Sequence, residues 1–240
     1  MADVAVVVGV AASDGLGAAI ARRFAREGLT LLVAGRTPER LEQVCTEINA
    51  TGGESHWQKT DATVESEVEA LMQRAAQLGV VKSVIFNVGN NQPIAFADLT
   101  PDTFEQFWRV CVFSGYLTAR AALPILEQNS GSLLFTGASA SMRGRPGFAH
   151  FGSAKAGLRN LAQALAKDYG PKGVHVGHVV VDGGINGERL RSRFSQYMDS
   201  LGEDGTLSPN AIADSYWFMH QQPRSVWTFE LDVRPYKENW

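Results

Sequence analysis

The sequence predicts an α/β fold in which helices cover both faces of a mostly parallel, doubly wound, seven-stranded sheet. Three observations support this: short apolar runs recur along the chain, amphipathic segments lie between them, and a glycine-rich turn joins the first run to the first amphipathic segment. Runs that are apolar throughout are typical of strands buried on both faces. Their alternation with helices predicts βαβ units with right-handed crossovers, and 240 residues suit one domain, 1–240.

Strands are expected wherever the chain is continuously apolar over a short run. One further strand is expected just ahead of Asp61. The apolar runs are 4–8, 29–34, 83–86, 132–136, 175–181 and, near the C-terminus, 226–233.

Helices are expected between these strands. Within 15–28, Ile20 and Phe24 lie one helical turn apart while the charged residues point elsewhere. The longest helical stretches are 103–128, expected to close near Pro124, and 152–169. The segment 183–206 is richer in Gly, Ser and charge, and it is either a lid over a ligand or an ordinary long surface connection.

Composition narrows the range of functions. A formal net charge of −3 without a basic patch argues against nucleic acid or an anionic membrane as a partner. Cys45 and Cys111 are the only cysteines, too few for a disulfide framework and wrongly spaced for a metal site. The N-terminus lacks the features of a secretory signal, and no apolar run approaches the ~18 residues that span a bilayer. We therefore expect a cytoplasmic protein that binds no metal.

A phosphate-binding turn is predicted after the first strand. Gly9 ends that strand, and Gly15, Leu16 and Gly17 open the helix that follows. Glycines let the backbone turn tightly and approach a pyrophosphate, while a helix N-terminus presents free N–H groups to the anion. The alternative is a helix-start turn that binds no ligand.

The end of the second strand predicts which dinucleotide is bound. In an NAD enzyme an acidic residue there binds the adenosine ribose, but this chain has Arg36 followed by Thr37. A guanidinium pairs bidentately with a 2′-phosphate, and Thr37 adds a hydroxyl contact. NADP(H) is therefore predicted in preference to NAD(H); the alternative is that Arg36 is an exposed loop cation.

Taken together, several motifs resemble those of the short-chain dehydrogenase/reductase (SDR) family. The glycine turn resembles the family's Thr-Gly-x-x-x-Gly-x-Gly, with Val8 in place of the threonine and five residues, 10–14, where the family usually has three. Asp61, Asn87-Val88-Gly89 and Asp182-Gly183 stand where the family has an adenine-side Asp, Asn-Ala-Gly and Pro-Gly. The resemblance extends over nearly the whole chain. It implies a Rossmann-like domain, a homodimer or homotetramer, and a small-molecule substrate. It also implies cofactor contacts from Gly9, Ser13, Gly15, Leu16, Gly17, Arg36, Thr37, Asp61, Asn87, Gly89, Lys155, Gly183 and Ile185.

The same resemblance implies an altered catalytic site. Residues 151–155 resemble the family's Tyr-x-x-x-Lys, with Phe151 in place of the tyrosine and Lys155 retained. Aligned without gaps, Ala138 takes the position of the family's serine, and Cys111 that of its asparagine. Lys155 is expected to hold the cofactor ribose, because nothing in the sequence depresses its pKa, and Ser139 is the first candidate for substrate contact.

Two functions follow from this pattern. One is an NADP(H)-dependent oxidoreductase that reduces a small carbonyl or conjugated substrate by hydride transfer without the usual tyrosine acid. The other is a catalytically silent NADP(H)-binding sensor or interaction protein. Loss of a positioned general acid costs ~10²–10⁴ in rate, so the altered positions favour the second function, whereas the retained lysine favours the first. His150 is an alternative proton donor, although on a helix it points about 100° away from Phe151.

Overall fold

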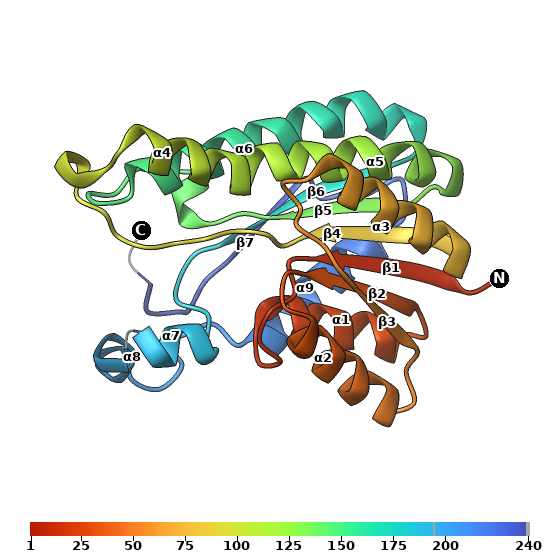
Figure 1. Cartoon of the computed structure of the whole chain (residues 1–240), viewed down its shortest axis with the longest axis horizontal. Helices are drawn as coiled ribbons and strands as arrows, with labels where there is room; N and C mark the ends of the chain where they lie inside the picture. The colour runs from red at the N-terminus through yellow and green to blue at the C-terminus, as the bar shows by residue number, and fades with distance from the viewer. Residues whose placement is uncertain (194, 239–240) are drawn as a thin grey trace.

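The computed structural model describes residues 1–193 and 195–238, and within them all strands lie in a single parallel sheet. The strand order is β3-β2-β1-β4-β5-β6-β7, and every neighbouring pair is parallel (Figure 1). The strands are β1 (Asp3–Val8), β2 (Thr30–Gly35), β3 (Ser55–Lys59), β4 (Val80–Phe86), β5 (Ser132–Thr136), β6 (His175–Val181) and β7 (Glu230–Val233).

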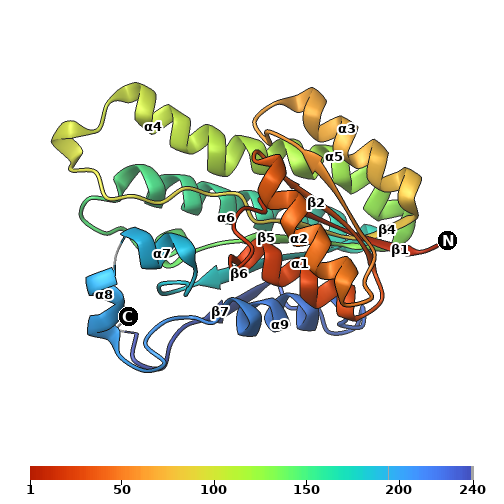
Figure 2. The ribbon, with the colours of Figure 1, turned by 60° about the horizontal axis from the view of Figure 1, so that its bottom comes forward.

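Helices cover both faces of this sheet. α1, α2 and α9 lie on one face, and α3, α5 and α6 on the other, as Figures 1 and 2 show from two directions. The helices are α1 (Leu16–Arg26), α2 (Pro38–Ala50), α3 (Glu65–Leu78), α4 (Pro101–Trp108), α5 (Ser114–Asn129), α6 (Ala149–Tyr169), α7 (Glu188–Arg193), α8 (Ser195–Leu201) and α9 (Pro209–His220). The predicted fold class is thereby confirmed.

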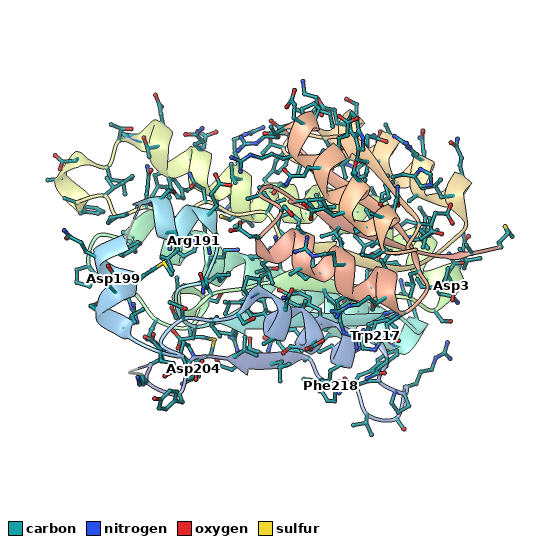
Figure 3. The ribbon with its side chains drawn as sticks, turned by 90° about the horizontal axis from the view of Figure 1, so that it is seen from below. Asp3, Arg191, Asp199, Asp204, Trp217 and Phe218 are labelled. Atoms are coloured by element: carbon teal, nitrogen blue, oxygen red, sulfur yellow. The ribbon has the colours of Figure 1, made fainter. Side chains whose placement is uncertain are left out.

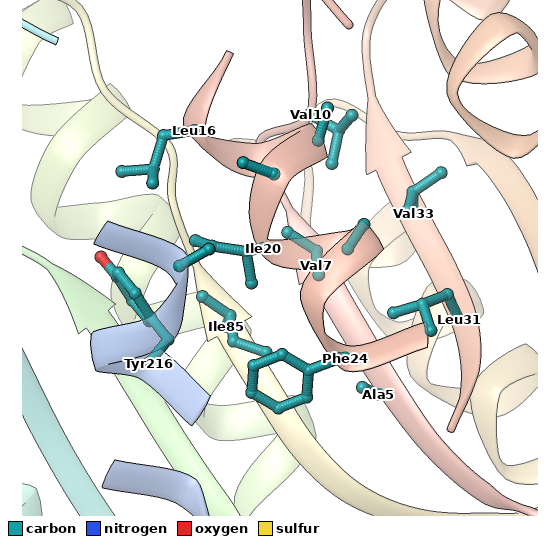
Figure 4. Packing of buried hydrophobic residues seen from close by; sticks show 14 of the residues in the cluster. Ala5, Val7, Val10, Leu16, Ile20, Phe24, Leu31, Val33, Ile85 and Tyr216 are labelled. Carbon is teal, nitrogen blue, oxygen red and sulfur yellow. The ribbon is translucent and has the colours of Figure 1, made fainter. Parts of the chain in front are cut away.

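Each face has its own hydrophobic cluster. Figure 4 shows part of the first, where Ile20 and Phe24 of α1 pack between β1, β4 and Tyr216 of α9. Phe24 also meets Trp217 edge-on, with ring centroids 5.2 Å apart. Burying side chains of this size stabilises the fold by ~1.5–3 kcal/mol each, so α9 is held against α1 mainly by apolar packing.

The long helix on the other face differs from the sequence expectation. It was expected to close near Pro124, but α5 continues through this proline to Asn129 because Leu123 and Leu126 on either side are buried in the core. α4, a π-helical turn (Arg109–Phe113) and α5 follow one another without a break. By length and composition alone this stretch could cross a membrane, contrary to the sequence expectation; 56% of its most apolar window is nonetheless buried in the fold, as in core helices of soluble proteins.

The strand order reverses between β1 and β4, and this creates the crevice where ligands bind in doubly wound sheets. A side chain could not be accommodated at Gly9, because a Cβ there would lie 2.7 Å from the backbone carbon of Asn87. The carboxyl ends of β1 and β4 therefore meet closely at the crevice.

A buried hydrogen-bond chain ties α9 to these strand ends. The Tyr216 hydroxyl lies 2.6 Å from the Thr136 hydroxyl, which donates to the side-chain carbonyl of Asn87 (2.9 Å); the Asn87 amide in turn donates to the carbonyl of Gly9 (3.0 Å). Because Thr136 donates to Asn87, it accepts from Tyr216. Burial raises the pKa of Tyr216, so the phenol stays protonated as a structural donor.

Removing this donor is expected to destabilise the fold. Tyr216→Phe should lower the free energy of unfolding by ~1–3 kcal/mol, because the buried Thr136 oxygen loses its donor. Urea unfolding of the wild type and the variant measures the difference. The matched control is Tyr236→Phe. Tyr236 is 77% exposed, so this change should leave the free energy of unfolding unaltered. Equal losses in the two variants would contradict the role given to the hydrogen-bond chain.

Candidate functional site

The glycine-rich loop places a helix N-terminus at the mouth of the crevice. α1 begins after Gly15, whose N-cap position carries no side-chain hydrogen bond to the first turn. Gly17 fits closely under the loop, because a Cβ there would lie 2.8 Å from the Gly9 carbonyl oxygen and 3.0 Å from the Asn87 amide. Glycine at this position therefore lets the start of α1 pack directly against the ends of β1 and β4, and a helix N-terminus at such a turn is an arrangement that can hold a pyrophosphate through backbone N–H groups.

Ser13 and Leu16 have side chains directed elsewhere. The Ser13 hydroxyl donates to the Glu47 carboxylate on α2, and Arg22 contacts Glu47 at 3.2 Å and the Ser13 carbonyl at 2.7 Å. The Leu16 side chain is buried in the core cluster (Figure 4). At these two positions the backbone is the part of the residue left to meet a ligand.

Asn87 was singled out as a cofactor contact in a turn whose backbone the family brings close to the ribose, and its side chain joins the strand ends. The Asn87 side-chain amide donates to the Gly9 carbonyl, and the Asn87 side-chain carbonyl accepts from the Thr136 hydroxyl. Sequence reasoning did not find Thr136 or Tyr216 as its partners, since a lone Thr at a strand end and a Tyr in a distant helix carry no local signal. The backbone of residues 87–89 remains at the edge of the crevice.

Arg36, Thr37 and Asp61 lie at the carboxyl ends of the next two strands. Arg36 and Thr37 are exposed where β2 ends. The Asp61 carboxylate accepts from the Thr63 N–H (2.9 Å) and hydroxyl (2.7 Å). Partial burial opposes ionisation, but these hydrogen bonds and the nearby Arg36 guanidinium hold the pKa of Asp61 below its ordinary value. Arg36 is therefore a solvent-facing cation beside an ionised carboxylate.

Lys155 reaches the crevice from the second turn of α6. Its ammonium donates to the Thr136 carbonyl at 2.8 Å, and a Cβ on Gly89 would lie 3.3 Å from Nζ. The residue is only 4% exposed, and burial lowers its pKa, an effect that Cys111 partly opposes. The expectation that nothing depresses the pKa of Lys155 was wrong, because burial depends on tertiary packing that the sequence pattern does not display.

Two of the three residues at the altered catalytic positions gather around this lysine. The Phe151 ring centroid lies 6.0 Å from Nζ, and Cys111, fully buried in the π-helical turn, interacts with it electrostatically. The third, Ala138, ends the loop after β5, where its N–H donates to the Ser141 hydroxyl at 3.1 Å. Phe151 and Ala138 offer no polar side-chain atom to a substrate.

Ser139 opens the short 3₁₀ turn after Ala138 and is half-buried. Its carbonyl accepts from Met142 and Arg143, whereas its hydroxyl makes no hydrogen bond within the part of the chain that the structure describes. Ser141 is already engaged with Ala138. Of these two serines, Ser139 is the one whose hydroxyl is available to hydrogen-bond a ligand.

The end of β6 borders the same crevice. Asp182 is 1% exposed and receives two hydrogen bonds from Arg143, at 2.9 and 3.1 Å. Gly183 is half-buried beside Pro235, and Ile185 pairs with Leu207 in an isolated parallel bridge. The bridge closes the base of segment 183–206, which forms α7 and α8 on the side of the sheet where the strands end (Figure 1).

Segment 183–206 contacts the glycine-rich loop through ion pairs. Arg191 of α7, marked in Figure 3, pairs with Asp14, and Glu188 pairs with Arg40 of α2 at 3.0 Å. Gly187 lies against the Asp14 carbonyl. Asp14 and Glu188 line a polar hollow of about 610 Å³ beside the loop. Asp14 is the last of the five residues, 10–14, that stand where the family usually has three, and this loop therefore provides a contact for α7.

His150 is turned away from the lysine. Its Nε2 donates to the carbonyl of Gln92 (3.1 Å), and its ring meets Phe107 of α4 edge-on at 4.2 Å. As for metals, no group of three or more His, Cys, Asp or Glu side chains in residues 1–193 and 195–238 is placed to hold an ion.

A partly buried group of titratable side chains lies near Lys155. His178 of β6 donates through Nδ1 to Glu230 (3.0 Å), and Glu230 also receives Arg159 at 2.6 and 2.9 Å. Burial lowers the pKa of His178 to about 4, although Glu230 opposes the shift. His178 is therefore neutral at pH 7.

Stability is expected to fall in mild acid because of His178. In the unfolded chain His178 takes up a proton below a pKa of ~6.5, whereas in the folded chain it does so only near pH 4. Protonation therefore favours the unfolded chain and lowers the free energy of unfolding by ~2 kcal/mol at pH 5. Thermal melting at pH 7 and pH 5 measures the loss, which His178→Gln should reduce. An NMR titration that finds His178 protonated at pH 6 would contradict the prediction.

Comparisons with known proteins agree with this architecture. The family model described as short chain dehydrogenase matches residues 3–197. An uncharacterized oxidoreductase of Listeria monocytogenes is 30% identical over 98% of this chain and 98% of its own length. The crystal structure of a short-chain dehydrogenase from Rhodopseudomonas palustris has 34% identity and a TM-score of 0.84, covering 98% of this chain and 99% of that one.

A further structure shares the fold at lower identity. It is an NADPH-bound short chain oxidoreductase from Pseudomonas aeruginosa PAO1, described as containing an atypical catalytic center. Its identity is 23% and its TM-score 0.89, covering 99% of this chain and 97% of that one. On the family model and the relatives at 30% identity or more, this chain belongs to the short-chain dehydrogenase family of oxidoreductases.

Proposed function

We propose that the protein is an NADP(H)-dependent oxidoreductase that reduces a small carbonyl or conjugated substrate without a tyrosine acid. The observation that carries the proposal is the position of Lys155, whose buried ammonium lies beside Gly89 with Phe151 and Cys111 next to it, two residues that stand where the family usually has a tyrosine and an asparagine. A cofactor-binding arrangement is thus kept where the usual proton donor is missing.

The cofactor half fits a dinucleotide lying along the carboxyl edge of the sheet. The loop at Gly9, Gly15 and Gly17 would hold the pyrophosphate, and one of the two N–H groups of Lys155 left by Thr136 would hold a ribose hydroxyl. Gly183 and Ile185 would border the nicotinamide. When bound, the reduced nicotinamide supplies a hydride.

Arg36 supports NADP(H) over NAD(H). It is exposed at the end of β2, with Thr37 beside it, and no carboxylate occupies the position itself. Arg36 lies near enough to the Asp61 carboxylate to lower its pKa. That carboxylate already accepts a hydrogen bond from the Thr63 hydroxyl. The guanidinium is therefore available to a 2′-phosphate. The structural relative from Pseudomonas aeruginosa was solved with NADPH.

On the substrate side, Ser139 is proposed to donate its hydroxyl to the carbonyl oxygen. A conjugated carbonyl demands less from a proton donor than a simple ketone, because the negative charge that develops is spread over more atoms. The crevice offers little other polar side-chain contact, since Ser141, Asp182 and Asn87 are engaged within the protein.

A catalytically silent NADP(H)-binding protein is the second candidate. The observation that favours it is the absence of a hydroxyl on Phe151 and Ala138 beside a glycine-rich loop that is kept. The two candidates differ in turnover and not in binding.

One experiment separates them. Purified protein is titrated with NADPH and NADH while protein fluorescence is followed, and the loss of reduced-nicotinamide absorbance is then recorded with carbonyl and conjugated acceptors. NADPH binding tighter than NADH binding, with turnover of at least one acceptor, supports the oxidoreductase. Tight binding without any turnover supports the silent protein, and no binding of either nucleotide contradicts both.

Segment 183–206 is proposed to be a lid whose closed position is stabilised by Asp14 and Arg191. Arg191→Gln is expected to speed NADPH release about two- to fivefold at low salt, since exposed ion pairs contribute ~0.2–1 kcal/mol. Stopped-flow fluorescence measures the release rate, and high salt should abolish the difference. Arg120→Gln is the matched control, because it removes a similar exposed pair with Glu65 on the opposite face. Equal release rates at low salt would contradict the lid contact.

A homodimer or homotetramer is proposed through the α4–α5 face. Phe104, Trp108 and Tyr116 are exposed there, and Phe113 stacks between the last two with centroid distances of 6.2 and 6.1 Å. An exposed aromatic stripe of this kind marks a protein contact more often than an open surface. Sedimentation velocity measures the oligomeric state.

The two cysteines are free and buried, which supports the proposed cytoplasmic location.

A further inference from the structure

Lys155 lies in an environment unlike that of a surface lysine. It sits on α6 between the end of β5 and the turn after β4, and its exposed fraction is 4%. Its one hydrogen bond within the described chain goes to a neutral carbonyl, that of Thr136. A side chain on Gly89 would crowd Nζ at 3.3 Å, so the ammonium lies directly beneath the exposed backbone of Gly89 in the turn after β4.

The charged and titratable groups around this ammonium do not neutralise it. Among the described residues no carboxylate forms an ion pair with Lys155. Cys111 faces it from the π-helical turn, and His178 acts on it from β6. His178 is held by Glu230, whose charge is in turn shared with Arg159. A buried ammonium without a carboxylate partner is poorly solvated, so losing a proton relieves its desolvation cost.

Most of the other proton donors near the site are engaged within the protein, and the thiol of Cys111 is fully buried, at 0% exposure, so it does not reach a substrate. The Tyr216 hydroxyl donates to Thr136, and the His150 N–H donates to Gln92. Ser141 is bonded to Ala138, and Phe151 has no proton to give. Ser139 has a free hydroxyl, but an alkyl hydroxyl is too weak an acid to be a proton source by itself. The remaining acidic N–H groups at the crevice are those of Lys155.

We infer that Lys155 is itself the proton donor in the reduction, in place of the tyrosine that this chain lacks; the inference rests on the proposed function. The substrate carbonyl carbon receives the hydride, a C–H bond forms, and the C=O π electrons move to oxygen. That oxygen takes a proton from Nζ, and the N–H bond breaks to leave a neutral amine. A proton taken up from the solvent restores the ammonium, so the sum is carbonyl, reduced nicotinamide and one proton giving alcohol and oxidised nicotinamide.

The consequence for catalysis follows from the burial of the group. An acid works best when its pKa lies near the working pH, and burial moves the pKa of Lys155 down towards it. The amine left after proton transfer is also the form that a desolvated site favours. The retained lysine thereby does more than hold a ribose.

The first test compares Lys155→Arg with Lys155→Met. Arginine keeps the positive charge and the N–H donors but does not release a proton, because its pKa lies far above the working pH. If Lys155 is the donor, Lys155→Arg should bind NADPH within about threefold of the wild type and lose ~10²–10⁴ in kcat, and its kcat should lose the alkaline fall seen in the wild type. Lys155→Met should lose both binding and turnover. If the lysine only holds the ribose, Lys155→Arg keeps kcat and its pH profile.

The second test does not depend on turnover or on a variant that folds well. The side-chain amine of Lys155 is titrated by NMR in the wild-type protein, with the signal assigned by its absence from Lys155→Met. It should titrate clearly below the exposed lysines, with Lys172 and Lys237 as internal references. Turnover with an ordinary titration of Lys155, or with full activity in Lys155→Arg, overturns the inference and leaves the proposed function standing. A lowered titration without turnover on any acceptor defeats the proposed function, and the donor role with it.

Discussion

Phe151→Tyr combined with Ala138→Ser is expected to raise the rate of carbonyl reduction by on the order of 10²-fold. The change adds a phenol next to the Lys155 ammonium and a hydroxyl at the start of the loop after β5. The ammonium, 6.0 Å from the Phe151 ring centroid, would stabilise the phenolate and so make the phenol a stronger acid. The gain is placed at the low end of the range for general acids because Lys155 is proposed to supply a proton already.

The measurement is kcat/KM for reduction of a simple ketone with NADPH. The matched control is Phe148→Tyr with Ala140→Ser, which adds the same two hydroxyls at half-buried positions nearby and should leave the rate unchanged. Thermal melting and NADPH titration establish that each variant folds and binds. A properly folded, NADPH-binding double variant without any gain would mean that the crevice differs from the family's in shape as well as in its donors.

Arg36→Asp is expected to reverse the nucleotide preference. The guanidinium is replaced by a carboxylate that repels a 2′-phosphate but accepts hydrogen bonds from the ribose hydroxyls of NADH. Loss of one charge-assisted hydrogen bond contributes ~1.5–3 kcal/mol, and the repulsion adds to it, so the Kd for NADPH should rise by about 10²-fold while that for NADH falls. Fluorescence titration with both nucleotides measures the ratio of the two Kd values.

The control for this charge reversal is Arg26→Asp. Arg26 is exposed in the last turn of α1, at the opposite end of the helix from the glycine-rich loop, and its replacement changes the net charge by the same amount. It should leave both Kd values unchanged. A ratio of Kd values that is the same in Arg36→Asp as in the wild type would show that Arg36 does not contact the nucleotide, and the preference for NADP(H) would lose its support.

The strands were predicted most reliably where burial is complete. The runs 132–136 and 175–181 coincide with β5 and β6, because a strand covered on both faces must be apolar at every position. The run 226–233 overestimates β7, which spans only Glu230–Val233 at the sheet edge, where burial is partial. Pro124 was a poor guide to a helix end, since tertiary packing on both sides of it outweighs the loss of one hydrogen bond.

Side-chain roles were harder to predict than elements. Asn87 was recognised by its motif, but the structure uses its side chain between Gly9 and Thr136. Asp14 lies in the glycine-rich loop, and its partner Arg191 lies 177 residues away in the chain. Such contacts join segments whose spacing in sequence carries no information about their distance in space.

The sequence by itself determined the alternation of strands and helices, the glycine turn, the cation at the end of the second strand, and the absence of a hydroxyl at Phe151 and Ala138. Each of these is a property of residue type and local order. Only the tertiary structure decided that Lys155 is buried without a carboxylate partner, that Tyr216 supports the strand ends, and that α7 meets the glycine-rich loop. Desolvation and long-range pairing depend on which elements pack together, and that is a property of the assembled fold.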